Sequence, residues 1–274
     1  MPELSPTILT EKKSTHRSGT LPYLLKQKKL KLDENLTVYV GGGCNSVVLT
    51  SKDGKEAIVV DTKWFRSAKA LRAAVKAPKV TVINTHFHLD HARGNKLYPS
   101  AYVISGETNW KHWDWDTNRS KRPDKALKPG EELSIRLDDE IIHVVAVGKA
   151  HSANDLVVYL SRRRLLAVGD LVCVNMHPPL VDPKGSVACW REALDKIEKD
   201  FAIDTLVPGH GAVGTRDSLS SMKDYFSRIA NALNDPQELR QLKSVYKSYK
   251  TFPKFVNFDR TVKVMRKEMA SGPE

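Results

Sequence analysis

Residues 84–91 read Asn-Thr-His-Phe-His-Leu-Asp-His. Three of the nine histidines and an aspartate fall within six positions here, at His86, His88, Asp90 and His91. Burying several imidazoles around a carboxylate costs free energy unless a partner compensates for their lost hydration. Because imidazole and carboxylate groups are ligands for zinc, the stretch predicts a divalent metal centre.

The residues before the histidines indicate how the ligands are presented. Residues 80–84 read Val-Thr-Val-Ile-Asn, a stretch rich in β-branched residues that predicts a buried strand, and this strand ends where the histidines begin. His86 and His88 are two positions apart, so both rings can face the same side of an extended segment. A turn at Leu89 can then direct the following aspartate and histidine to a neighbouring point. One loop can therefore supply ligands to two metal ions.

Three more candidate ligands occur later in the chain. Each follows a predicted apolar strand and is flanked by a turn residue; they are His151, Asp170 and His210. The complete set is five histidines and two aspartates, which suits two metal ions with positions left open for water and substrate. These ligand types fit zinc, and they also fit iron or manganese.

Short strands alternate with helices through the rest of the chain. Helical spacing predicts helices at 67–76 and 190–200. Strands are predicted at 36–40, 45–50, 57–60, 80–84, 101–105, 156–160, 165–168 and 205–207, with a hairpin around 138–139. The order of strands, helix and strand occurs twice, which predicts two sheets packed together with helices outside them.

Length and composition narrow the class of protein. The 274 residues suffice for one large α/β domain. No apolar run approaches the roughly 20 residues needed to cross a bilayer, and the N-terminus lacks a basic segment followed by an apolar one. The three cysteines are odd in number and lack CxxC spacing, which is typical of buried thiols in a reducing compartment. We therefore expect a cytoplasmic protein that does not bind membranes.

The net charge of +12 is concentrated at the two ends of the chain. Residues 1–32 hold seven Lys and Arg against two acids, and residues 221–274 hold eleven against six, which leaves +2 for residues 33–220. We expect a basic, poorly ordered N-terminal arm over 1–32, a catalytic domain over 33–220 and a basic helical C-terminal extension over 221–274. Such charge runs are typical of solvated surfaces. Without an aromatic-basic groove motif, we expect no nucleic-acid partner.

The ordered set of motifs resembles that of the metallo-β-lactamase fold superfamily. Residues 85–91 are similar to its HxHxDH motif, and His151, Asp170 and residues 208–211 are similar to its remaining metal motifs in the same order. The resemblance covers roughly residues 35–225. It implies an α/β fold, the αββα four-layer sandwich, with two zinc ions at one edge between the sheets.

The resemblance also implies a role for each candidate. A hydroxide between the two metals would be the nucleophile, and Asp90 would hold its proton and pass it to the leaving group. Asp61, after the predicted strand 57–60, would orient a ligand rather than bind metal. Asp170 would bridge both metals. The first metal would be held by His86, His88 and His151, and the second by Asp90, His91 and His210.

The resemblance narrows the reaction without choosing one substrate, because fold alone does not determine function. Asp170 is similar to glyoxalase-II-type and lactonase-type sites, whereas lactamases of the largest subclass place a cysteine there. Residues 151–160 nevertheless resemble those lactamases. We expect a metal-dependent hydrolase that cleaves an ester, thioester, lactone or lactam bond of a small anionic molecule. The alternatives are β-lactamase-like activity, or a phosphodiesterase or nucleic-acid-acting enzyme that uses the basic ends.

A few further residues are candidates for substrate contact, and each also has a structural interpretation. His177 lies shortly after Asp170. Asn154 fits a turn before the strand 156–160, and Trp110 belongs to a tryptophan-rich segment that is either a substrate wall or a helix face. Lysines of the C-terminal helices are candidates for attracting an anionic substrate: Lys243, Lys247 and Lys250.

Overall fold

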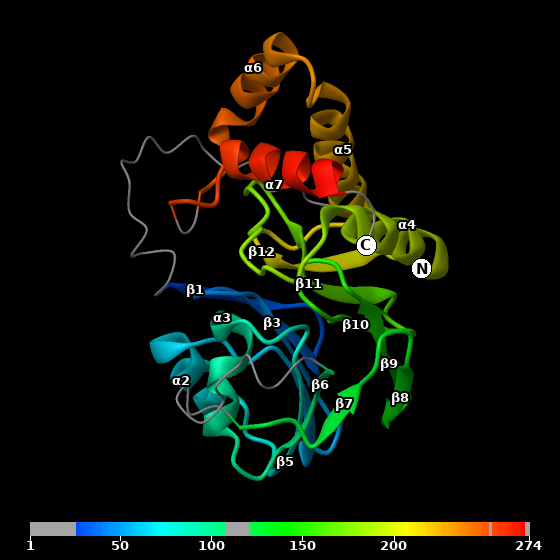
Figure 1. Cartoon of the computed structure of the whole chain (residues 1–274). Coiled ribbons are helices and arrows are strands. Elements are labelled where there is room, and N and C mark those ends of the chain that lie inside the picture. Colours follow the sequence, from blue (N-terminus) through cyan, green and yellow to red (C-terminus); the bar gives the residue numbers. More distant parts are fainter. Residues whose placement is uncertain (1–25, 108–120, 252–253, 272–274) are drawn as a thin grey trace, which may run out of the picture.

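Two β-sheets stacked face to face, with helices on both outer sides, make up the protein (Figure 1). The computed structural model describes residues 26–107, 121–251 and 254–271. This arrangement is the αββα sandwich, so the predicted fold is confirmed.

The first sheet contains seven strands in the order of the sequence. They are β1 (Gln27–Lys31), β2 (Leu36–Gly41), β3 (Ser46–Thr50), β4 (Glu56–Val60), β5 (Lys79–Ile83), β6 (Tyr102–Gly106) and β7 (Lys125–Leu127). Strands β1 to β4 pair antiparallel, whereas β4 to β7 pair in parallel. A parallel pair needs a crossover connection. The crossovers after β4 and β5 contain α2 (Phe65–Ala74), α3 (Leu89–Ala92) and the 3-10 helix η1 (Arg93–Leu97).

The second sheet contains five strands in the order β12-β11-β10-β9-β8. They are β8 (Glu132–Leu137), β9 (Glu140–Gly148), β10 (Asp155–Leu160), β11 (Leu165–Cys173) and β12 (Thr205–His210). All neighbours are antiparallel except β11 and β12, which are parallel and are connected through α4 (Val187–Asp200). Along β9 buried and half-buried residues alternate, as expected for a strand with one face in the core.

Aliphatic side chains of both sheets form the core between them. Val38, Val47 and Val60 of the first sheet belong to one cluster with Val144 and Leu156 of the second. Each of these side chains is at most 3% exposed. Because burying one such side chain contributes about 1.5–3 kcal/mol, this core fixes the two sheets against each other. The loops at the strand ends are thereby held in a fixed relation.

The helical layers differ in thickness. On the first sheet, Leu71 of α2 belongs to one buried cluster with Val59, Val82 and Val103. The second sheet is covered by α4 and by four C-terminal helices, which are α5 (Arg216–Ala232), α6 (Pro236–Val245), η3 (Tyr246–Ser248) and α7 (Phe258–Ser271). The helical C-terminal segment expected from the sequence is therefore packed onto the sandwich.

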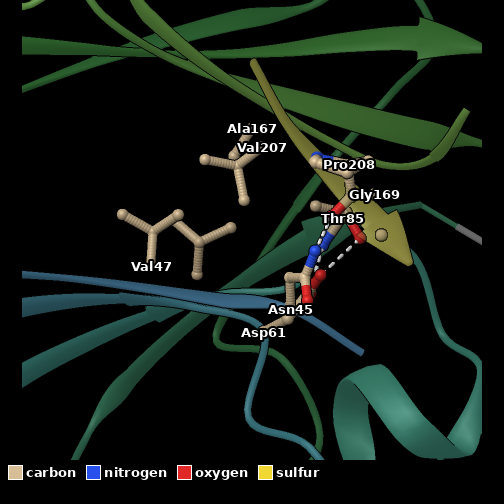
Figure 2. Close-up of a pocket in the computed structure, with 10 residues that line it drawn as sticks. Asn45, Val47, Asp61, Thr85, Ala167, Gly169, Val207 and Pro208 are labelled. Carbon is tan, nitrogen blue, oxygen red and sulfur yellow. Dashed lines mark hydrogen bonds between the residues drawn. The ribbon is translucent and has the colours of Figure 1, made fainter. Parts of the chain in front are cut away.

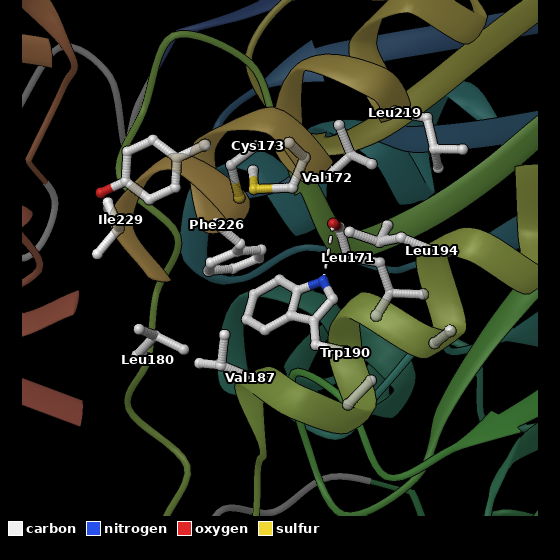
Figure 3. Packing of buried hydrophobic residues seen from close by; sticks show 14 of the residues in the cluster. Leu171, Val172, Cys173, Leu180, Val187, Trp190, Leu194, Leu219, Phe226 and Ile229 are labelled. Atoms are coloured by element: carbon white, nitrogen blue, oxygen red, sulfur yellow. Dashed lines mark hydrogen bonds between the residues drawn. The ribbon is translucent and has the colours of Figure 1, made fainter. Parts of the chain in front are cut away.

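Trp190 of α4 lies at the centre of this second helical layer (Figure 3). Its side chain is fully buried, its ring contacts Phe226 of α5, and its Nε1 donates a hydrogen bond to the carbonyl oxygen of Leu171 at 3.0 Å. The same cluster includes Leu242 of α6 and Met265 of α7. One continuous apolar core therefore joins the second sheet to all of the C-terminal helices.

One expected boundary lies inside a helix. Helix α5 runs across residue 220, where the catalytic domain and the C-terminal extension were expected to meet. Pro236 begins α6, and Asp235 caps that helix by accepting hydrogen bonds from the backbone amides of Gln237 and Glu238. The division of the chain into 1–32, 33–220 and 221–274 stays a prediction.

Strand β1 forms one edge of the first sheet. Among the described residues it pairs with β2 alone, and four of its five side chains are exposed, among them Lys28, Lys29 and Lys31. Part of the expected N-terminal arm is therefore an edge strand. Among the described residues, no helix is both long and apolar enough to cross a membrane.

Candidate metal centre

The seven candidate ligands lie together; six are at or just after strand ends, whereas Asp170 lies within β11, which continues past the end expected at residue 168. Strand β5 leads to His86 and His88, and the turn expected at Leu89 is the start of the short helix α3, which carries Asp90 and His91. The other three come from the second sheet: His151 follows β9, Asp170 lies in β11, and His210 ends β12.

One group of ligand atoms comprises His86, His88, His151 and Asp170. The Nδ1 atom of His88 lies 3.0 Å from Nε2 of His86 and 3.0 Å from Nε2 of His151. The Oδ2 atom of Asp170 lies 4.0 Å from Nε2 of His86 and 3.6 Å from Nε2 of His151. Ligand atoms at about 2.0–2.1 Å around one tetrahedral zinc ion are separated by roughly 3.3 Å, so these spacings suit a single ion.

A second group comprises Asp90, His91 and His210, and it also faces Asp170. Nε2 of His210 lies 3.4 Å from Oδ2 of Asp90, and Nε2 of His91 lies 3.8 Å from the same oxygen. Both nitrogens lie 3.1 Å from Oδ1 of Asp170.

The two oxygens of Asp170 therefore face different groups. Oδ2 faces the first group and Oδ1 faces the second, although the carboxylate side chain is only 3% exposed. Gly209 makes this approach possible, because a Cβ atom at position 209 would lie 2.1 Å from Oδ1 of Asp170. The strand β12 can thus pass directly beside the carboxylate.

Asp61 lies behind the second group. Its Oδ2 is 2.7 Å from Nδ1 of His91, and its Oδ1 accepts a hydrogen bond from the backbone amide of Thr85 at 2.8 Å. The hydroxyl of Thr85 donates to Oδ2 of Asp61 at 2.8 Å. This arrangement fixes the ring of His91 so that Nε2 points at Asp170. A further group of Cys44, Asp61 and His91 is found on the Nδ1 side of the same ring.

The glycine turn after β2 supports His210 in the same way. Nδ1 of His210 donates to the carbonyl oxygen of Gly43 at 2.9 Å, which leaves Nε2 for the second group. Asn45 connects this turn to the end of β12, because its Nδ2 donates to the carbonyl oxygens of Pro208 at 2.9 Å and Gly211 at 3.0 Å. The turn is therefore part of the support of the site.

Lys63 is a buried cation that the sequence pattern does not single out. Its side chain is inaccessible to solvent, and Nζ donates to the carbonyl oxygens of Tyr39, Gly41 and Cys44. Burial lowers the pKa of this lysine to about 8, although nearby acidic groups oppose the shift. Lys63 thus holds the same glycine turn from the opposite side.

The chemical state of the groups fits bound metal. Burial lowers the pKa of His86, His88 and His151, which favours the neutral imidazole that a metal binds. Burial opposes protonation of His91 and His210 as well, yet the surrounding anionic groups, Asp170 and Asp90 among them, raise the pKa of both. The second group therefore attracts positive charge.

Some buried polar atoms of the described residues make no hydrogen bond, and two of them face one another in the second group. Nε2 of His91 and Oδ1 of Asp170 make no hydrogen bond within the described part of the chain. They face one another at 3.1 Å. A divalent cation at this point would satisfy both, so the residues present fit the metal that the motif implies.

Comparison with known proteins agrees with this geometry. The sequence model of the metallo-beta-lactamase superfamily matches residues 39–210, which is more than half of the chain. The chain belongs to this superfamily. It is therefore a metal-dependent hydrolase by family, and the predicted family and enzyme class are confirmed.

Known superfamily proteins are distant relatives. A metallo-beta-lactamase type 2 from Bacillus cereus is 26% identical over 215 residues, which cover 74% of this chain and 82% of that protein. The alpha subunit of 2,4-dinitroanisole O-demethylase from Nocardioides sp. (strain JS1661) is 25% identical over 167 residues, which cover 56% of this chain and 48% of that subunit. The solved structure of a metallo-beta-lactamase from Pontibacter korlensis has a TM-score of 0.62 at 19% identity, with 73% of this chain and 98% of that chain covered. The last similarity shows the shared fold alone.

A small cavity lies between the two sheets of the metallo-beta-lactamase fold, beside Asp61 (Figure 2). Its volume is about 10 Å³, close to the space that one water occupies. Asn45, Asp61 and Thr85 provide its polar lining, and Val47 and Val207 are among its apolar lining residues. The cavity is too small for a substrate.

Two of the residues expected to contact substrate, Asn154 and His177, bond to residues outside the two ligand groups. The amide of Asn154 donates to the carbonyl oxygens of Leu127 and Glu107, and the residue is 1% exposed, which fits its structural interpretation. Nδ1 of His177 lies 2.9 Å from the hydroxyl of Tyr225, among the aromatic residues of the C-terminal helices. Trp110 lies outside the described residues.

Proposed function

We propose that the chain is a dinuclear zinc hydrolase that cleaves an ester, thioester, lactone or lactam bond in a small anionic molecule. The two-sided placement of Asp170 carries this proposal, because one carboxylate faces two separate ligand groups. The histidine-rich donor set and its spacings favour zinc, while iron and manganese use the same ligand types.

Each group would hold one ion, with Asp170 shared between them. His86, His88 and His151 would hold the first ion, and Asp90, His91 and His210 the second. When bound, such a pair polarises the scissile carbonyl and makes water a stronger nucleophile near neutral pH. The protein contributes a fixed ligand geometry, which Asp61 supports through His91, and the glycine turn through His210.

Asp90 is the proposed acid-base residue of the site. Its side chain is 19% exposed, more than those of His91, His210 and Asp170 around it, so it lies on the open side of the second group. A carboxylate in this place can accept a proton from the attacking water and return it to the leaving group. In this proposal Asp90 both helps to hold the second ion and transfers the proton.

β-Lactam hydrolysis is the second candidate function. The name of the Bacillus cereus relative supports it, because that protein is a metallo-beta-lactamase aligned over most of both chains. The name of the O-demethylase subunit indicates that a related chain acts on an aryl methyl ether. Asp170 stands where lactamases of the largest subclass have a cysteine, which favours ester, thioester or lactone substrates over lactams.

Metal analysis combined with a substrate screen tests the proposal. The purified full chain is expected to contain about two zinc ions. It is expected to hydrolyse at least one of nitrocefin, an aliphatic lactone and S-lactoylglutathione, with bis(p-nitrophenyl) phosphate as the phosphodiester comparison. His88→Ala should abolish that activity, whereas His143→Ala, on the outside of β9, should retain it. Activity retained in His88→Ala, or one metal ion or fewer per chain, would contradict the dinuclear mechanism.

A further inference from the structure

A second cavity, of about 270 Å³, lies between the start of α2 and the 3-10 helix η1. Four cations line it, two from each helix: Arg66 and Lys69 from α2, and Arg93 and Lys96 from η1. The remaining lining residues are apolar, and no acidic side chain lines it. The cavity is therefore a concentrated source of positive potential.

The charge of this cavity is not balanced locally. Residues 62–106 contain eight Lys and Arg and a single acid, Asp90, which belongs to the metal centre. Within the described part of the chain, none of the four lining cations forms an ion pair with a protein carboxylate. By contrast, Lys243, one of the lysines expected to attract an anionic substrate, pairs with Asp259 at 2.7 Å. Lys243 thus has a carboxylate partner, whereas the four cations that line the α2–η1 cavity have none among the described residues.

An aromatic ring stands at the same cavity. Phe65 is 55% exposed, and the guanidinium carbon of Arg93 lies 4.6 Å from the centre of its ring. The backbone of Phe65 has φ +44°, a left-handed conformation that a bulky residue adopts only at a cost in free energy. Lys63 and Asp61 are also left-handed, at φ +60° and +58°. The strained loop that places Asp61 behind His91 thus also displays Phe65 to solvent.

Backbone hydrogen bonds connect the cavity wall to the metal centre. The amide of Thr62 donates to the carbonyl oxygen of His91 at 2.7 Å, and the amide of Gly94 donates to the carbonyl oxygen of Lys63 at 2.9 Å. The close fit of Gly94 against Thr62 leaves no room for a Cβ atom there. The two walls therefore hold a fixed relation to one another, so the cavity is formed before any ligand binds.

We propose that this cavity binds the phosphate group of a small phosphate monoester whose planar part rests on Phe65, as in a nucleoside monophosphate. Arginine matches phosphate oxygens with paired donors, and lysine adds compact positive charge. An exposed aromatic ring beside cations suits the stacking of a nucleobase. The site is separate from the ligand groups around Asp170, and binding there does not require hydrolysis.

Titration calorimetry of the zinc-loaded full chain with adenosine 5′-monophosphate tests the proposal. The double variant Arg66→Gln/Arg93→Gln should bind at least roughly tenfold more weakly, because hydrogen bonds to charged groups are lost. A matched control, Lys76→Gln/Arg136→Gln, removes the same charge from exposed positions outside the cavity and should bind like the unmodified chain. Adenosine should not bind, and inorganic phosphate should bind more weakly than the nucleotide.

Four outcomes would contradict the proposal, the first three as a whole and the fourth in its planar group, and all are distinct from failure of the hydrolase. Equal binding by Arg66→Gln/Arg93→Gln would show that the cavity is not the site. Loss of binding in His88→Ala would place the phosphate at the metal centre instead. An equal loss in the control pair would show unspecific attraction to a basic protein. Phe65→Ala without any effect on nucleotide affinity would remove the planar group from the proposal.

Discussion

Asp61 is the residue on which the orientation of His91 depends. Its Oδ2 faces Nδ1 of His91 and accepts a hydrogen bond from the hydroxyl of Thr85, the residue before His86. Its Oδ1 accepts a hydrogen bond from the backbone amide of Thr85. A single carboxylate thereby aligns the ring of His91 and the start of the histidine motif. Loss of such a supporting partner typically lowers metal affinity or activity about 10–100-fold.

Replacing this carboxylate tests its supporting role. Asp61→Asn keeps the shape of the side chain but loses the charge that holds His91, so we expect zinc affinity at the second group to fall about 10–100-fold. Competition with a metal-sensitive chelator dye measures this affinity. The control Asp204→Asn alters an exposed carboxylate and should leave it unchanged. Unaltered metal affinity in Asp61→Asn would show that the Asp61 contact does not contribute to the site.

The sequence indicates the candidate ligands and, through Asp61, one residue that supports them, but it does not indicate Lys63. The histidines and aspartates could be predicted because their types and order are unusual, and because each follows an apolar strand. Lys63 could not, since a lysine in a loop normally lies at the surface. Its burial depends on three carbonyl oxygens and on a left-handed backbone at position 63. Neither the carbonyl contacts nor the left-handed backbone can be predicted from the order of apolar and polar residues.

At the scale of elements, the glycine turn 41–43 is held from two sides. Lys63 binds the carbonyl oxygens of Gly41 and Cys44, and Asn45 binds the end of β12. Between these attachments, Gly43 accepts the hydrogen bond of His210. The turn consequently fixes the ring of His210 relative to the end of β12.

Removing the charge of Lys63 should loosen this turn. We expect Lys63→Met to lower the free energy of unfolding by about 2–4 kcal/mol, because hydrogen bonds to a charged group contribute about 1.5–3 kcal/mol each and the relief of burying the charge offsets part of that loss. Zinc affinity at the second group should fall with it. Chemical denaturation and metal titration measure both, and the exposed Lys76→Met is the control. A loss of stability with unchanged metal affinity would separate Lys63 from the site.

Strands could be predicted where apolar or alternating residues ran over several consecutive positions. The strands at 36–40, 57–60 and 156–160 match β2, β4 and β10 to within one residue. The three-residue strand β7 was not predicted, because it is too short to show a period and depends on pairing with β6. Helix α2 begins at Phe65, two residues before the predicted start, since the strained loop sets its first turn.

For the whole molecule, burial of His177 links stability to pH. His177 is 4% exposed, and burial lowers its pKa below the ordinary 6.5, with only partial compensation from the carboxylate of Asp259. The unfolded chain therefore binds a proton at this residue more readily than the folded chain does. Its contribution to stability is present above pH 6.5 and is lost as the pH falls below that value.

We expect His177→Gln to weaken this dependence. Between pH 7.5 and pH 5.5 the free energy of unfolding of the zinc-loaded chain should fall, and the fall should be smaller in His177→Gln, because glutamine cannot acquire the proton. Denaturant titrations at several pH values measure the difference. His143→Gln is the comparison on the outside of β9. An identical pH dependence in all three proteins would exclude this role for His177.

The overall architecture was predictable as two sheets with outer helices, but the extent of the second helical layer was not. Amphipathic spacing in the C-terminal segment indicates helices without indicating their partner. In the structure, Tyr225, Leu242 and Met265 share a core with Val172 of β11. Such contacts between distant parts of the chain depend on tertiary packing, which no local pattern of residues contains.

The lysine-rich edge strand β1 has a consequence for crowded solutions. An unpaired strand edge offers backbone donors and acceptors to any other chain, and sheets can grow by adding strands there. Here a second copy approaching β1 would bring Lys28, Lys29 and Lys31 against the same three cations. The repulsion opposes assembly of copies into a continuous sheet, and added salt screens it. The first sheet should thus be less resistant to self-association at high ionic strength than at low ionic strength.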